Sequence, residues 1–278
     1  MMEPSNCSMS QEEYLLLNEL ITQQFGITFP EHKREMLEAR LRSRLHALHL
    51  PRFLDYYLQL QRDPNGERKK LAELVTNNET YFFREAQQFE AFFDEAARLA
   101  GRGRTLRVLC AGCSSGEEPY TLAIHGRQNA ACLGGKTVEI DAFDVDAGRI
   151  EMARRAEYGR TSLRSLTNQQ VEHYFTPVER ERWSLRSPFR EGVRFAWGNI
   201  LDPATFPLAA AYDAIFCRNV LIYFSEAALR SAVRHFASAL RPGGLLFLGV
   251  AESIIGLSDQ FETVRLRRAI AYRRGETP

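Results

Sequence analysis

The chain has 278 residues, of which 26% are charged and 45% hydrophobic, and its formal net charge at pH 7 is +1. This near-neutral balance argues against a nucleic-acid-binding protein, and the composition is that of an ordinary globular protein with one or two domains. No apolar run reaches membrane-spanning length, and the polar opening MMEPSNCSMSQEE is unlike a signal peptide, so we expect a cytoplasmic protein.

The five cysteines are scattered along the chain, which indicates reduced thiols rather than a disulfide framework. Cys110 and Cys113 form a Cys-x-x-Cys pair, but no second pair of ligands lies nearby in the sequence. A redox or metal role therefore has little support, and we expect no bound metal. The other cysteines are Cys7, Cys132 and Cys217.

Residues 1–75 have the pattern of an all-helical domain. Ser10, with Glu13 three residues later, predicts a capping box at the start of a first helix that ends at Gly26. A second helix is predicted from Pro30 and a third from Pro51, and a fourth follows a turn at residues 63–66. The apolar faces of the first two helices are formed by Leu16, Leu20, Ile21, Leu37, Leu41, Leu45 and Leu48.

Basic residues run beside the leucine stripe of the second helix. Lys33, Arg40 and Arg44 are the most regular of them. A solvated helix face is the more common explanation of such a pattern. The alternative is a strip that docks an acidic partner helix.

Residues 76–102 form a linker and a further helix, and they open with the unusual segment TNNETYFFRE. One interpretation is a capped helix with buried aromatic side chains. The other is a lid that places Asn78, Thr80 and Arg84 over a ligand.

The stretch from Leu106 to Ile124 predicts a buried strand, a turn from Gly112 to Gly116, and a helix with Glu117 and Glu118 in its first turn. Gly112 would let the backbone approach a nucleotide. The turn lacks the Gly-Lys-Ser/Thr ending of a phosphate-binding loop, and two carboxylates would repel a pyrophosphate. They suit a ligand with hydroxyls and a positive charge, as in S-adenosylmethionine, although a purely structural turn is the alternative.

From residue 103 to residue 278, strands alternate with helices, which predicts a doubly wound α/β domain with a parallel sheet. A polar stretch at about 158–192 interrupts the alternation and predicts a small inserted subdomain. Polar residues end successive predicted strands, and ligands bind beyond the carboxyl ends of strands in such sheets. These strand-end residues are Gly112, Asp144, Asn199, Arg218 and Asn219. A turn at Pro242-Gly243-Gly244 is expected before a strand over 245–250, and a hairpin over 262–266 and 269–273 closes the domain.

Together these segments resemble the CheR-type chemotaxis receptor methyltransferases, from about Phe25 to the last strand. The resemblance rests on GITFPEHKREMLEARLRSRLHAL, TNNETYFFRE, AGCSSGEEPY, FDVD, YDAIFCRNVLIYF and LRPGGLLFLGVAES. It implies an enzyme that transfers the methyl group of S-adenosylmethionine to glutamate side chains on the helical cytoplasmic domain of chemoreceptors. The products would be glutamate methyl esters and S-adenosylhomocysteine.

The resemblance also implies roles for individual residues. Arg84 and Tyr223 would lie nearest the transferred methyl, and the basic second helix with Lys33, Arg40 and Arg44 would dock the receptor. Cofactor contacts would fall on Asn78, Thr80, Arg84, Glu118, Asp144, Asn199, Ile200, Arg218 and Asn219. In some members a small β-subdomain binds a pentapeptide at the receptor's C-terminal tail. Here the stretch Thr176–Glu191 lacks the glycine-rich loop of those members, which argues against such tethering.

Three other hypotheses stay open at this stage. The enzyme could methylate a signalling receptor unrelated to motility or another protein carboxylate, or the chain could be a cofactor-binding interaction module that does not catalyse. A nucleic-acid methyltransferase is weaker, because the net charge is near zero.

Overall fold

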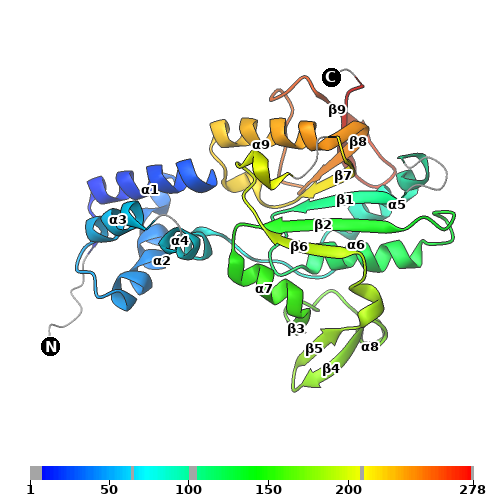
Figure 1. Cartoon of the computed structure of the whole chain (residues 1–278), viewed down its shortest axis with the longest axis horizontal. Coiled ribbons are helices and arrows are strands. Elements are labelled where there is room, and N and C mark those ends of the chain that lie inside the picture. Colours follow the sequence, from blue (N-terminus) through cyan, green and yellow to red (C-terminus); the bar gives the residue numbers. More distant parts are fainter. Residues whose placement is uncertain (1–7, 64–65, 100–104, 207–209, 277–278) are drawn as a thin grey trace. The chain divides into compact units, whose positions relative to one another are not determined.

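The computed structural model describes residues 8–63, 66–99, 105–206 and 210–276 (Figure 1). The chain divides into two compact units. We call the first the helical unit: it holds the described residues up to Asn77, together with Tyr223–Leu229. We call the second the sheet unit: it holds Asn78–Ile222 and the described residues from Arg230 onward. None of the described helices has the length and apolar character needed to cross a bilayer.

The helical unit contains four helices, as predicted. They are α1 (Gln11–Phe25), α2 (Arg34–Ala47), α3 (Phe53–Arg62) and α4 (Glu67–Val75), with a short 3-10 turn at Glu31–Lys33 before α2. The predicted capping box is confirmed: the Glu13 N–H donates to Ser10 Oγ at 3.2 Å, and the Ser10 N–H donates to the Glu13 carboxylate at 2.8 Å. Gly26 ends α1 in the left-handed conformation, with φ +76°.

A buried ion pair joins α2 to α4. The Arg44 guanidinium donates to both oxygens of Glu67, at 2.7 and 2.6 Å, and the Tyr56 hydroxyl of α3 donates to the same carboxylate at 3.1 Å. Glu67 is only 5% exposed, and the bond from Arg44 lowers its pKa. Arg40 donates to the carbonyl oxygens of Val75 (2.6 Å) and Thr76 (3.2 Å). Two of the three residues predicted to dock a receptor therefore also hold the helical unit together.

Tyr223–Leu229 groups with the helical unit, although the sequence assigned it to the catalytic domain. The Thr28 N–H donates to the Tyr223 carbonyl at 2.9 Å, and the Ser225 N–H donates to the Gly26 carbonyl at 2.8 Å. A side chain at Gly26 would lie 2.9 Å from the Ala228 Cβ, so this position needs glycine for space as well as for its positive φ. The predicted domain boundaries at residues 75 and 102 stay predictions.

The sheet unit is built on a seven-stranded sheet in the order β6-β2-β1-β7-β8-β10-β9. Strands β6, β2, β1, β7 and β8 are parallel, and the β9–β10 hairpin pairs antiparallel along the β8 edge. The strands are β1 (Leu106–Ala111), β2 (Val138–Asp144), β6 (Val193–Trp197), β7 (Tyr212–Cys217), β8 (Leu240–Leu248), β9 (Phe261–Arg265) and β10 (Ile270–Arg274). The predicted doubly wound α/β fold is confirmed, and β1 lies between β2 and β7, in the middle of the five parallel strands (Figure 1).

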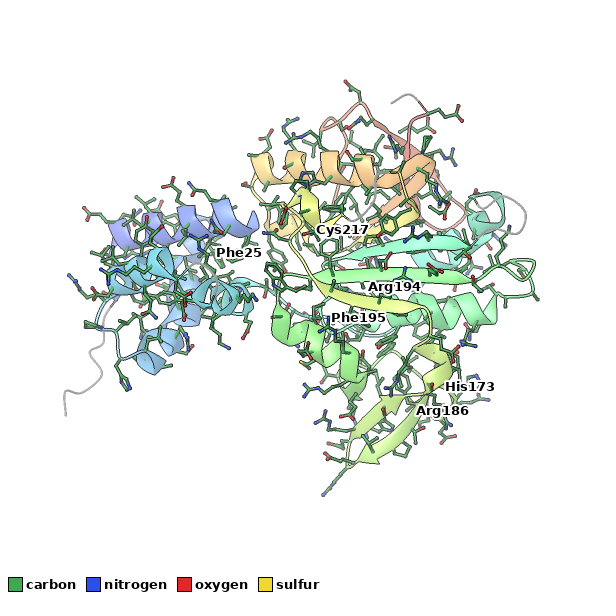
Figure 2. The ribbon with its side chains drawn as sticks, in the orientation of Figure 1. Phe25, His173, Arg186, Arg194, Phe195 and Cys217 are labelled. Carbon is green, nitrogen blue, oxygen red and sulfur yellow. The ribbon has the colours of Figure 1, made fainter. Side chains whose placement is uncertain are left out.

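Helices cover both faces of this sheet. They are α5 (Ala86–Leu99), α6 (Glu117–Gln128), α7 (Ala147–Arg155) and α9 (Glu226–Ala239). Alternate strand residues such as Val108 and Phe216 share one core cluster with α5 and α6. The intervening residues, such as Leu109 and Cys217, are buried as well (Figure 2 labels Cys217). Burial on both faces explains why these strands are nearly continuous in apolar residues.

The predicted turn at Pro242-Gly243-Gly244 is wrong. Strand β8 already begins at Leu240 and passes through these residues. The register with β7 shifts there: Tyr212 pairs with Leu240, but Ala214 pairs with Leu245. The irregularity takes up the extra residues without ending the strand, and Gly243 provides a positive φ of +77°. The strand also ends at Leu248, two residues earlier than predicted.

The inserted subdomain is a three-stranded antiparallel sheet in the order β3-β5-β4 with one helix. Its elements are β3 (Glu157–Gly159), α8 (Asn168–Tyr174), β4 (Phe175–Glu179), β5 (Arg182–Leu185) and a 3-10 turn at Ser187–Phe189. Phe82 packs edge-on against Tyr158 and Phe175, with ring centroids 4.8 and 5.0 Å apart. Arg186, labelled in Figure 2, joins α8 to β4 by donating to the Glu172 and Phe175 carbonyls, each at 3.1 Å.

The Arg44–Glu67 pair yields a stability prediction. We expect Arg44→Ala to destabilise the helical unit by about 2 kcal/mol, because it leaves the buried Glu67 carboxylate without its cation. The matched control is Arg42→Ala on the same helix. Arg42 is 40% exposed and pairs with Glu38, so its loss should cost under about 0.5 kcal/mol. Native-state hydrogen exchange of α2 and α4 amides measures both, and equal losses would contradict the prediction.

The same pair predicts a pH dependence. The pKa of Glu67 is lowered in the folded state, so its stabilising contribution is present above the unfolded pKa of about 4.3 and is lost as the pH falls through the lower, folded value. Arg44→Ala should remove this acid-sensitive contribution.

Candidate active site

The glycine turn connects the carboxyl end of β1 to α6, and both of its glycines are required. Gly112 has φ +80°, and a side chain there would lie 2.6 Å from Val220 Cγ2. Gly116 has φ +91°, and a side chain there would lie 2.9 Å from the Ala153 Cβ. The N–H groups of Gly112 and Cys113 donate to the Phe143 carbonyl, at 2.9 and 3.1 Å. These two donors therefore bind the turn to β2.

The Asp144 carboxylate, at the end of β2, binds the same turn. It accepts the Ser114 N–H at 2.7 Å and the Asp146 N–H at 2.8 Å. Burial raises its pKa to about 6, although both N–H bonds oppose the shift. A carboxylate oxygen has two lone pairs, so Asp144 keeps acceptor capacity for a ribose hydroxyl after both backbone bonds are made.

The two acids of the first turn of α6 have separate roles. Glu117 is 1% exposed, accepts hydrogen bonds from the hydroxyls of Ser115 and Ser162, each at 2.8 Å, and has a pKa raised by burial. It links the glycine turn to the inserted subdomain. The Glu118 side chain is 14% exposed and accepts a bond from Arg218 Nη1 at 3.0 Å. Burial raises the Glu118 pKa, and the Arg218 charge opposes that shift.

Arg218 is the central cation of the site, and its side chain is only 2% exposed. Its guanidinium also donates to the Arg84 carbonyl at 2.6 Å and lies 3.2 Å from the Glu85 carboxylate. It stacks over the Phe89 ring, 4.9 Å from the centroid. Because its guanidinium already binds these groups, Arg218 fixes the positions of Glu118 and of the chain at Arg84.

The segment from Asn78 to Glu85, which we call the crossing segment, passes over the glycine turn. Asn78 donates to the Asp146 carboxylate at 2.7 Å, and its carbonyl accepts the Ser114 hydroxyl at 3.3 Å. Arg84 donates to the Glu79 carbonyl at 3.0 Å and stands between two non-glycine residues with positive φ, Phe83 (+59°) and Glu85 (+52°). Such strained backbone is common where a functional side chain must be aimed.

The inserted subdomain holds this segment in place. The Phe82 N–H donates to the Ser162 carbonyl at 2.9 Å. Arg164 pairs with Glu79 at 2.9 Å and lies over the Tyr81 ring, 3.8 Å from its centroid. Thr80 and Arg84 are therefore carried on a segment fixed at several points between residues 78 and 85.

The remaining predicted contacts lie at the ends of β6 and β7. Asn199 Oδ1 accepts the Leu201 N–H at 3.0 Å, and the buried Ile200 offers its carbonyl to His235 at 2.9 Å. Asn219 has φ +61°, and its N–H donates to the Glu252 carboxylate at 2.7 Å. Tyr223 lies in the helical unit, where its hydroxyl accepts from Asn77 Nδ2 at 2.6 Å.

Glu252 was missed in the sequence analysis. Its carboxylate accepts the N–H groups of Asn219 and Gly249, each at 2.7 Å, and of Ile222 at 3.2 Å. It thus joins the ends of β7 and β8 as Asp144 joins those of β1 and β2. The sequence feature that could have indicated Glu252 is its position as an acid four residues beyond β8, in the segment LGVAES.

Neither thiol of the Cys-x-x-Cys pair has the properties of a reactive cysteine. Cys110 and Cys113 are both free and buried, and burial raises both pKa values well above the ordinary range. Within the described ranges, no cluster of three or more histidine, cysteine or acidic residues is arranged to hold a metal ion.

The residues brought together at the strand ends fit S-adenosylmethionine chemically. Glu118 and Asp144 are acceptors suited to hydroxyls and positive charge, and Asn78 adds an amide beside them. Hydrogen bonds through Ser114, Asp146, Arg218 and Glu252 connect these elements. The individual cofactor contacts stay predictions.

Comparison with known proteins agrees with this fold and this chemistry. The profile described as "CheR methyltransferase, all-alpha domain" matches residues 12–76, and "CheR methyltransferase, SAM binding domain" matches residues 78–270. "Chemotaxis protein methyltransferase 2" of Vibrio cholerae serotype O1 is 32% identical over 95% of this chain and 93% of its own length. "Chemotaxis protein methyltransferase" of Escherichia coli strain K12 is 34% identical over 91% of this chain and 88% of its own. The family predicted from the sequence is confirmed.

Among solved structures, the chain is similar to the CurJ carbon methyltransferase. The match covers 68% of this chain and 54% of the CurJ chain, at 16% identity and a TM-score of 0.42.

Asp144 gives a first prediction for the site. In Asp144→Asn an amide NH₂ must face one of the two backbone N–H groups, so we expect cofactor affinity at pH 7.5 to fall about tenfold or more. In the wild type, affinity should also fall as the pH drops through about 6, because protonation removes acceptor capacity. Calorimetric titration with S-adenosylmethionine between pH 5 and 8 measures both effects.

The matched control is Asp141→Asn on the same strand, where the carboxylate binds Arg194 at 2.7 Å instead of the turn. Its cofactor affinity should stay within about twofold of the wild type. An Asp144→Asn variant with wild-type affinity and the same step near pH 6 would refute the assignment.

Arg218 gives a second prediction. Arg218→Leu leaves two carboxylates without their shared cation, so we expect a loss of about 3 kcal/mol in the stability of the sheet unit. Arg218→Lys should recover little of it, because an ammonium cannot match the forked geometry of a guanidinium. Denaturant unfolding can be followed by the fluorescence of Trp183 and Trp197, which both lie in this unit.

The exposed Arg127–Glu191 pair supplies the control, since Arg127→Leu should cost under about 0.5 kcal/mol. Adding Glu118→Gln to Arg218→Leu should restore part of the lost stability. If the double variant is no more stable than Arg218→Leu, the unpaired Glu118 carboxylate is not the cause of the lost stability.

Proposed function

Because the chain belongs to the CheR methyltransferase family, we propose that it transfers the methyl group of S-adenosylmethionine to glutamate side chains of a chemoreceptor. The products are glutamate methyl esters and S-adenosylhomocysteine, and the reaction serves adaptation in chemotaxis-type signalling. The observation that carries the proposal is the agreement of two family profiles, which together match residues 12–76 and 78–270.

We assign the cofactor to the strand ends of the sheet unit. Glu118 and Asp144 accept its hydroxyls and face its positive charge, and Asn78 and Thr80 contact it from the crossing segment. The other proposed contacts are Arg84, Gly112, Asn199, Ile200, Arg218 and Asn219. Arg218 is included because its guanidinium donates hydrogen bonds to Glu118 and to the Arg84 carbonyl.

The chemistry requires little from the protein beyond positioning. When bound, S-adenosylmethionine supplies a methyl group activated by its sulfonium centre. A glutamate side chain is already ionised at pH 7, so no general base is needed. The chain must align the incoming carboxylate for in-line attack and exclude water from it. We assign this alignment to Arg84, whose guanidinium can bind a carboxylate, with the Tyr223 hydroxyl in a supporting role.

The receptor-docking surface is the basic face of α2. Arg40 and Arg44 keep part of their charge exposed while they bind the helical unit, and Lys33 stands at the start of that face. Residues 176–191 lack the glycine-rich loop of tail-binding family members, so we do not assign tethering through a receptor C-terminal tail to the inserted subdomain.

The proposal is tested by the chemical nature of the product. Incubation with methyl-labelled S-adenosylmethionine and a chemoreceptor cytoplasmic domain should give receptor label that mild alkali releases as methanol, as a carboxyl methyl ester does. Alkali-stable label would indicate another acceptor. Tight cofactor binding without any transfer would indicate a binding module instead of an enzyme.

Two variants test the assigned roles in the same assay. Arg84→Ala should lower turnover about 100-fold, because the substrate carboxylate loses its orienting cation. Tyr223→Phe removes one hydroxyl and should lower turnover less than about tenfold. Wild-type turnover in both variants, with normal cofactor affinity, would remove these residues from the mechanism.

A further inference from the structure

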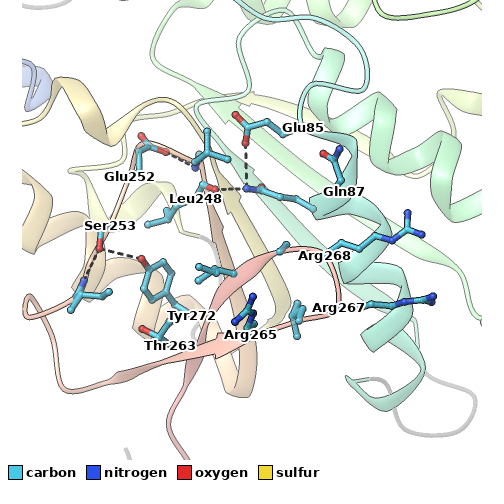
Figure 3. Close-up of a pocket in the computed structure, with 17 residues that line it drawn as sticks. Glu85, Gln87, Leu248, Glu252, Ser253, Thr263, Arg265, Arg267, Arg268 and Tyr272 are labelled. Carbon is cyan, nitrogen blue, oxygen red and sulfur yellow. Dashed lines mark hydrogen bonds between the residues drawn. The ribbon is translucent and has the colours of Figure 1, made fainter.

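A groove lies on the sheet unit beside the strand ends that carry the site (Figure 3). Its walls come from the start of α5, from the loop after β8 and from the β9–β10 hairpin. We call it the hairpin groove. Figure 3 shows Glu85 and Glu252 on one side of it, and Arg265, Arg267 and Arg268 on the hairpin side.

The hairpin groove shares residues with the proposed active site. Glu252 lines it and also holds the Asn219 N–H at 2.7 Å, and Glu85 lines it and pairs with Arg218 at 3.2 Å. Glu85 directly follows Arg84 in the chain. A molecule that fills the groove therefore reaches the residues that support the site.

The groove exposes an unusual amount of apolar surface. Val250 is 81% exposed, Ile255 72% and Ile270 58%, and all three line the groove. Apolar side chains gathered in this way beside polar residues are typical of interaction surfaces.

The hairpin wall adds positive charge that the described residues neutralise only at Arg268. Arg268 pairs with Glu90 of α5. Arg265 and Arg267 are exposed, and neither forms an ion pair with any of the described residues. On the opposite wall, Glu85 and Glu252 are occupied by Arg218 and by backbone N–H groups. Three arginines and two carboxylates line the groove, a formal charge of 3 − 2 = +1, and the positive charge lies on the hairpin wall.

One buried acceptor in the groove lacks a donor. Gln88 is 6% exposed, and its Nε2 donates to the Leu248 carbonyl at 2.8 Å. Its Oε1 is buried and accepts no hydrogen bond within the part of the chain that the structure describes. An unmet buried acceptor favours an occupant that brings a donor.

We propose that the hairpin groove binds an acidic, amphipathic helical segment of the substrate receptor next to the glutamate that is methylated. This inference rests on the proposed function. The apolar side of the segment packs on Val250, Ile255 and Ile270, its acidic side faces Arg265 and Arg267, and a polar side chain donates to Gln88. A second contact away from the transferred methyl fixes the angle at which the target glutamate enters.

Steady-state kinetics with the full chain and a receptor cytoplasmic domain test the proposal. Charge reversal by Arg265→Glu with Arg267→Glu should raise the KM for the receptor about tenfold, with kcat and the cofactor Kd within about twofold of the wild type. It should also weaken the dependence of this KM on salt concentration. Val250→Ser with Ile255→Ser should raise the KM through lost apolar contact. The matched control is Arg273→Glu, because Arg273 lies on the same hairpin but outside the groove and pairs with Glu262.

A second measurement does not depend on turnover. With a photoreactive benzoylphenylalanine in place of Ile255, irradiation should cross-link the chain to the receptor segment that flanks the methylated glutamate, as mapped by mass spectrometry. Cross-links to a second copy of this chain, or to its own first residues, would overturn the proposal.

The kinetic outcomes separate this proposal from the proposed function. If the wild type methylates the receptor and the groove variants keep its KM, the groove proposal fails and the function stands. If the wild type does not methylate any receptor glutamate and position 255 does not cross-link to the receptor, both fail.

Discussion

Parallel strands that end at one edge of a sheet leave backbone N–H groups that must find acceptors, and in this protein carboxylates provide them. Asp144 holds the turn after β1 to the end of β2, and Glu252 holds the end of β7 to the end of β8. Each carboxylate accepts at least two backbone donors. These two carboxylates fix the turns that carry Asn219 and the start of α6, and with them part of the proposed cofactor site.

A buried cation completes this arrangement. Arg218 collects the negative groups that the glycine turn and the start of α5 bring together, namely Glu118, Glu85 and the Arg84 carbonyl. One guanidinium faces two carboxylates, so this cluster keeps a net negative charge before any ligand is considered. A cationic ligand is therefore favoured beside Glu118, whereas a phosphate would meet carboxylates on two sides.

Local patterns in the sequence predicted most of the fold. The capping box at Ser10, the glycine turn and the apolar strand runs each depend on neighbours within a few residues, and the structure contains all of them. The turn at Pro242-Gly243-Gly244 was wrong because strand pairing with β7 decides that conformation, and pairing depends on residues far away in the chain.

The same difference between local and distant contacts applies to the candidate site. Asp144 and Glu118 were predicted to be cofactor contacts from their places at a strand end and in a first helical turn. The hydrogen bonds by which Arg218 and Glu252 hold the site together were not predicted. Arg218 binds residues about 100 to 134 positions earlier in the chain, and Glu252 binds one 33 positions earlier. The internal bonds of Arg40 and Arg44 were missed for the same reason: a helical stripe reveals which face is basic, but not that α4 ends beside it.

The base of the inserted subdomain sets a limit on how relatives of this chain can diverge. Ser162 offers its hydroxyl to Glu117 and its carbonyl to Phe82, so one residue joins the subdomain, the glycine turn and the crossing segment. Phe175, the first residue of β4, adds a ring contact with Phe82, but the remaining residues of β4 are exposed and make no such contact among the described residues. Evolution can therefore reshape the outer strands, and any partner they recognise, while the attachment at Ser162 stays fixed. Exchange of subdomains between relatives should succeed when the cut is made beyond that attachment.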